Sequence, residues 1–104
     1  MKKILFNQFV DRVIATLSLK DPTILFHRSK RQDLVDARHL IFYLCADRNM
    51  SVADIKRLIG ERGLSLQYPA LVGGIAKVKK RVSLDPDYEF LVNKIQKSVG
   101  FEQE

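Results

Sequence analysis

The chain has 104 residues, the length of one domain with a single hydrophobic core. Hydrophobic residues make up 46% and charged residues 29%, which is typical of globular proteins and not of disordered ones. The formal net charge of +6 favours an anionic partner. The alternative interpretation is an ordinary solvated basic surface.

The positive charge belongs to the body of the chain. Residues 1–84 hold 16 Lys and Arg against 7 Asp and Glu, a net charge of +9. Residues 85–104 hold 2 against 5, a net charge of −3. Any anionic partner is therefore expected to bind the body of the domain and not its end.

Cys45 is the only cysteine, which excludes a disulfide framework and a cysteine-based zinc site. It lies in the apolar run LIFYLCA and is expected to pack in the core as a small hydrophobic residue. At the N-terminus, Asn7 and Gln8 interrupt the apolar residues too early for a signal peptide or a membrane span. We therefore expect a cytoplasmic protein that makes no contact with a membrane.

Apolar residues recur at helical spacing over residues 4–17, which predicts an amphipathic first helix. The segment 20–22, Lys-Asp-Pro, ends this pattern. Asp21 is expected to cap a short helix that begins at Pro22 and carries residues 24–26 into the core.

A basic cluster, HRSKRQ, follows at residues 27–32. Its cations, Arg28, Lys30 and Arg31, fall between two predicted helices, where they can reach a phosphate backbone or a minor groove. A long helix is predicted from about Arg31 to Asp47. Its wide apolar face is typical of the central helix of a bundle. That face consists of Leu34, Ala37, Leu40, Ile41, Leu44 and Cys45.

Residues 51–82 have the outline of a helix-turn-helix. Ser51 and Asp54 are expected to form a capping box, and Gly60 stands where a left-handed residue would end the first helix. After a polar connection, Pro69 suits the first turn of the second helix. The apolar stripe predicted for this second helix consists of Leu71, Val72, Ile75, Val78 and Val82.

The second of these helices is the candidate reader of the DNA major groove. Its C-terminal half carries Lys77, Lys79, Lys80 and Arg81, which are placed to meet phosphates. The pair Gly73-Gly74 inside the helix indicates close packing or close approach to a surface.

Asp85-Pro86 repeats the combination of a cap and a proline and predicts a final helix over residues 87–99, with Gly100 as its stop. Residues 101–104 are expected to be a frayed tail. Alternation of polar and β-branched residues is missing from the sequence, so no sheet is predicted. The predicted fold is all-α: one compact domain of five to six helices containing a helix-turn-helix, with its core between about residues 4 and 99.

The sequence carries no constellation of catalytic residues. It lacks a glycine-rich loop ending in Gly-Lys-Ser/Thr, and its carboxylates are scattered. His39 is expected to be a surface or partly packed residue, and His27 to add to the basic cluster. We therefore predict that the chain is not an enzyme and that it needs no cofactor, metal or small-molecule substrate.

The order and spacing of three segments resemble the C-terminal DNA-binding domain of the bacterial replication initiator DnaA, which belongs to the Trp-repressor-like helix-turn-helix group. ILFHRSKRQDLVDARHLIFYL is similar to the basic loop and long helix of that domain. SVADIKRLIG is similar to the segment that opens its helix-turn-helix, and IAKVKKRVSLDPDYEFLVNKI to the end of the domain. The resemblance covers roughly residues 9–97.

The resemblance implies a role for each cationic cluster. Lys30, with its neighbours Arg28 and Arg31, is expected to enter or flank the minor groove. Gln67 and Tyr68 begin the expected recognition helix at the major groove. Lys77, Lys79 and Lys80 are expected to contact phosphates.

One part of the family pattern is replaced here. The recognition helix of the family begins with Gly-Arg-Asp-His-Ser/Thr-Thr-Val, whereas residues 66–71 of this chain read LQYPAL. The connection after Gly60 is also about four residues longer. The acidic, histidine and threonine side chains with which the family contacts DNA are therefore substituted.

We expect a double-stranded DNA-binding protein that acts as an accessory regulator of replication or transcription. An origin in a phage or plasmid is suggested because the initiator's ATPase module does not precede the domain here. The alternative is a protein–protein interaction module that kept the fold and lost DNA binding. The replaced signature and Gly73-Gly74 favour the alternative, and the two basic clusters favour DNA.

Overall fold

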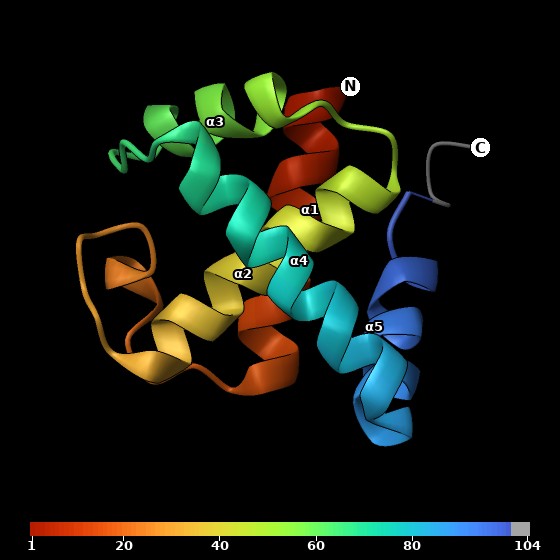
Figure 1. Ribbon diagram of the computed structural model, residues 1–104. Coiled ribbons are helices and arrows are strands. Elements are labelled where there is room, and N and C mark those ends of the chain that lie inside the picture. The colour runs from red at the N-terminus through yellow and green to blue at the C-terminus, as the bar shows by residue number, and fades with distance from the viewer. Residues whose placement is uncertain (101–104) are drawn as a thin grey trace.

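The computed structural model describes residues 1–100, which form five α-helices and one short 3-10 helix (Figure 1). This confirms the predicted all-α class. The predicted tail, residues 101–104, lies outside the described residues. In chain order the elements are α1 (Lys2–Leu17), η1 (Pro22–Ile24), α2 (Gln32–Asp47), α3 (Val52–Glu61), α4 (Tyr68–Leu84) and α5 (Pro86–Lys97).

The predicted central helix is α2. It packs against α1, α3 and α4, and Figure 1 shows α4 lying across it. Every residue predicted for its apolar face is buried, including Cys45, whose side chain is fully enclosed. Burial in apolar surroundings raises the pKa of the Cys45 thiol to about 12. The structure adds Arg38 and Phe42 to the buried residues of α2.

The predicted end of α3 at Gly60 is wrong. Gly60 lies within the helix, and Gly63 is the residue with a left-handed backbone, at φ 100°. The amide of Gly63 donates to the Gly60 carbonyl at 3.0 Å, and that of Leu64 donates to the Ile59 carbonyl at 3.2 Å. These two bonds form a Schellman motif, and the buried Leu64 supplies its apolar contact. Gly63 is therefore the required glycine, because only glycine adopts this φ without strain.

The side-chain caps at Ser51 and Asp85 are confirmed, but the second half of the predicted capping box, a hydrogen bond from the Ser51 amide to the Asp54 carboxylate, is not formed. Ser51 accepts a hydrogen bond from the Asp54 amide at 3.1 Å, while the Asp54 carboxylate binds Lys2 Nζ at 2.7 Å. Asp85 accepts from the amides of Asp87 and Tyr88 at 3.1 and 3.2 Å.

The cap predicted at Asp21 is wrong. The Asp21 side chain makes no cap hydrogen bond, because its carboxylate instead accepts from Arg31 at 2.8 Å. The short helix that follows is a single 3-10 turn. The apolar residues after this turn, Leu25 and Phe26, still reach the core as predicted.

The apolar face of α4 differs from the predicted stripe at one position. Leu71 and Val78 are buried, but Val72 is 42% exposed. The buried position between them is Gly74, which packs against the side chain of His39 on α2. A Cβ atom at residue 74 would lie 2.6 Å from His39 Cδ2, well inside van der Waals contact. The close packing predicted for Gly73-Gly74 therefore applies to Gly74.

The two neighbouring glycines of α4 give a matched test of this packing. Gly74→Ala should lower the free energy of unfolding by about 1 to 3 kcal/mol, because the new methyl group overlaps the His39 ring. Gly73→Ala should raise it by roughly 0.5 to 1 kcal/mol, because nothing lies within 4 Å of its Cβ position and alanine favours the helix. Urea denaturation monitored by circular dichroism measures both values. Equal effects of the two substitutions would contradict the close approach of α4 to α2.

Candidate nucleic-acid interface

The basic loop, residues 25–31, is built around the buried side chain of Arg38. This guanidinium donates to the carbonyl oxygens of Leu25 at 2.9 Å, His27 at 3.1 Å and Ser29 at 2.9 Å. Arg38 is only 8% exposed, and within residues 1–100 it is the one charged residue that is buried. No site role was predicted for Arg38, although its spacing from Leu34 and Cys45 places it on the buried face of α2.

Arg31 lies at the end of the basic loop and is held by two carboxylates. Its guanidinium donates to Asp21 at 2.8 Å and to both carboxylate oxygens of Asp33 at 2.8 and 3.1 Å. These hydrogen bonds, first with Asp33 and then with Asp21, raise the pKa of Arg31, and the same pairing lowers the pKa of Asp33. The charge of Arg31 is therefore compensated within the chain.

The other two cations of the loop border an open groove of about 510 Å³. Arg28, Lys30 and the Ser29 between them line it, together with Arg38 and the connection between α3 and α4. Arg28 and Lys30 are exposed, and within residues 1–100 neither has a carboxylate within 4 Å. The connection contributes Leu64, Ser65, Leu66 and Gln67, and the first turn of α4 contributes Ala70. The structure thus brings together Arg28, Lys30 and Gln67.

The remaining predicted residues of α4 point in different directions. A helix turns by about 100° per residue, so Lys77 and Lys79 lie roughly 160° apart around α4. Lys77 lines a small hollow with Asp36 and His39, on the side of α4 that faces α2. Lys79 shares the opposite side with Tyr68, and Lys80 points away from the core. Tyr68 is 59% exposed but does not line the groove.

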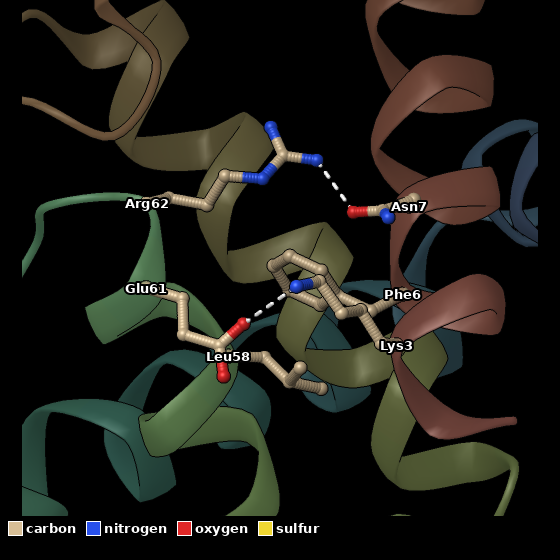
Figure 2. Close-up of a pocket in the computed structure, with 6 residues that line it drawn as sticks. All are labelled: Lys3, Phe6, Asn7, Leu58, Glu61 and Arg62. Atoms are coloured by element: carbon tan, nitrogen blue, oxygen red, sulfur yellow. Dashed lines mark hydrogen bonds and ion pairs between the residues drawn. The ribbon is translucent and has the colours of Figure 1, made fainter.

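Contacts from α1 fix the position of α3 and of the turn that precedes α4. Lys3 pairs with Glu61 at 3.2 Å, and Arg62 donates to the Asn7 side chain at 2.7 Å; both contacts are drawn in Figure 2. The Arg62 guanidinium also lies 5.6 Å from the centroid of the Phe6 ring, a cation–π contact. The first turns of α1 therefore position the turn region from which Gln67 projects.

His39 is partly buried where α2 meets α4. Burial lowers the pKa of its imidazole, and the nearby positive charge of Lys77 lowers it further. Asp36 opposes this shift, and Arg38 adds to it. The neutral imidazole is therefore the form that packs against Gly74.

Comparison with protein-family models, with curated proteins and with solved structures finds no match to this chain. The resemblance to the DnaA domain stays a prediction.

Within residues 1–100 no three side chains of the metal-binding types converge on one point. None of the helices described there has the length and apolar character needed to cross a bilayer.

The pKa of His39 predicts a dependence of stability on pH. The pKa of His39 is lower in the folded chain than in the unfolded one. The free energy of unfolding should therefore keep its full value with respect to His39 above about pH 6.5 and should decrease below that pH. Urea midpoints at about pH 7.5 and about pH 5.5 measure the difference. In His39→Gln this difference should shrink, whereas the control His27→Gln, on the exposed loop, should retain it. An unchanged difference in His39→Gln would contradict the assignment to His39.

Proposed function

We propose that this chain binds double-stranded DNA through a face formed by the basic loop, Gln67 and the exposed side of α4. One observation carries the proposal: Arg28 and Lys30, two cations that have no carboxylate partner within residues 1–100, share a groove with the start of the expected recognition helix. The net charge of +9 over residues 1–84 supports an anionic partner for this face.

The dimensions and surface of α4 suit the major groove. The helix has 17 residues and is therefore about 25 Å long. Small exposed residues, Pro69, Gly73 and Ala76, lie on its outward side, so its backbone can come close to the floor of the groove. Gln67 directly precedes the helix, where an amide side chain can reach a base edge. The amides of the first turn favour a phosphate nearby.

The basic loop lies beside the N-terminus of α4 and can contact the neighbouring minor groove or its phosphates. With α4 in the major groove of the DNA, the DNA backbone that separates the major from the minor groove would cross the protein's own open groove between Lys30 and Gln67. Arg28 and Lys30 would then hold this backbone by its phosphates, as exposed cations in loops commonly do. Arg31 is not among the proposed contacts, because two carboxylates already neutralise it.

The number of available cations sets the expected dependence of binding on salt. Arg28, Lys30 and Lys80 can face one DNA surface, together with one of the two lysines on the flanks of α4. About four phosphate contacts give a slope of log affinity against log salt of roughly −3 to −4.

The biological role that we propose is that of an accessory regulator of replication or transcription. It rests on the resemblance of the three segments to the DnaA domain. The substituted recognition signature implies a DNA site that differs from the initiator's own.

A second candidate function is the binding of an acidic, apolar peptide. Two observations favour it: Leu64, Leu66 and Ala70 form an apolar lining beneath the cations of the groove, and Tyr68 and Val72 are exposed on one side of α4. A peptide in this groove would contact Arg28 and Lys30 through its carboxylates. It would not require the outward side of α4.

Charge reversal tests the DNA proposal. Arg28→Glu with Lys30→Glu should weaken binding to random duplex DNA by at least about tenfold at low salt, because two phosphate contacts become repulsive. The salt slope should become shallower by roughly two. Fluorescence anisotropy of a labelled duplex across a salt series measures both quantities. The matched control is Lys94→Glu with Lys97→Glu on α5, which changes the net charge equally.

In the control variant, affinity should fall much less, since only the general field of the protein changes. Equal losses in the two variants would contradict a localised interface. A wild-type slope near zero would contradict DNA binding itself and leave the peptide as the better candidate.

A further inference from the structure

The cations of the proposed interface lie on a segment without regular secondary structure. Between Ile24 and Gln32 the backbone forms few bonds of its own, such as Ser29 N–H to the His27 carbonyl at 2.8 Å. A free loop of this kind samples many conformations, and binding would then have to order it at a cost in affinity. Something must therefore fix the loop if Arg28 and Lys30 are to act together.

The buried guanidinium of Arg38 fixes it from below. Its Nη1 donates to the carbonyls of Leu25 and His27, and its Nη2 donates to that of Ser29. Ser29 is the residue between Arg28 and Lys30, so holding its carbonyl sets the direction of both neighbouring side chains. The carbonyls turn inward to Arg38, and the two cationic side chains are left exposed at the groove.

We propose that Arg38 is a positioning residue, which preorganises the basic loop so that Arg28 and Lys30 meet DNA as a rigid pair. This inference rests on the proposed function for its consequence in binding, but its structural part can be tested without DNA. The planar fork of arginine matters here, because its rigid N–H groups can reach three carbonyls from one fixed position. A lysine carries the same charge on a single nitrogen and cannot reproduce this geometry.

The experiment compares Arg38→Lys, which keeps the charge, with Arg38→Met, which removes it and keeps an apolar stem. The first readout is trypsin cleavage after Arg28 and Lys30, relative to cleavage after exposed control sites such as Lys56 and Lys79. The second is affinity for random duplex DNA across a salt series. Circular dichroism at the same temperature confirms that each variant is fully folded.

Both variants should be cleaved in the loop at least about tenfold faster than the wild type, with unchanged cleavage at the control sites. Both should bind DNA about tenfold more weakly, because binding must now order the loop. The salt slope of Arg38→Lys should stay that of the wild type, since Arg28 and Lys30 still meet phosphates. A destabilised fold alone would instead raise cleavage at every site.

Wild-type behaviour of Arg38→Lys in both readouts would overturn the inference, because the charge and not the fork would then suffice. Unchanged loop cleavage in both variants would overturn it as well. Faster loop cleavage in a protein whose wild type binds no DNA would confirm the positioning of the loop and reject the proposed function. The two failures are therefore distinguishable.

Discussion

The close contact between Gly74 and the His39 ring determines how α4 lies on α2, and most of the candidate interface depends on that placement. A side chain at residue 74 would push the two helices apart, since its Cβ would lie 2.6 Å from the ring. With glycine there, α4 lies close enough to α2 for its N-terminus to border the basic loop. The groove between Lys30 and Gln67 follows from this approach.

Three arginines hold the surrounding parts in place, and Arg38 is thereby withdrawn from the solvent-facing charge. Arg38 binds three carbonyls beneath the basic loop, and Arg48 donates to the carbonyls of Gln96 and Val99 at the end of α5. Arg62 lies over aromatic rings at the junction of α1 and α3. The net charge of the chain therefore overstates the charge available to a partner. Arg28, Lys30 and the lysines of α4 belong to the part that stays exposed.

Local signals in the sequence predicted the elements well. The cap at Ser51, the prolines at residues 69 and 86 and the apolar spacing of α2 each act within one or two turns, so the sequence alone reveals them. The predictions that were wrong concern residues whose contacts lie far away in the sequence, or positions for which the sequence offers two candidates. Two glycines, Gly60 and Gly63, could end α3, and burial of Ile59 and Leu64 selects the second.

The candidate site was predictable in composition but not in arrangement. Basic residues indicated an anionic partner, yet the pairing of Arg31 with Asp21 depends on a loop closure that spacing does not reveal. The burial of Arg38 was visible in the helical periodicity, but its hydrogen bonds to the loop were not. Gln67 and Tyr68 are adjacent in sequence, and only the structure shows that Gln67 lines the groove and Tyr68 does not.

Chemical-shift mapping tests the central claim most directly. The isotope-labelled chain is titrated at low salt with a short random DNA duplex, and amide shifts are followed by nuclear magnetic resonance. Shift changes should concentrate in residues 27–30 and 65–80, with small changes in α5 and in the α1 residues that face away from the groove. Changes confined to α1 and α5, or no change at a DNA excess, would contradict a DNA interface built from the basic loop and α4.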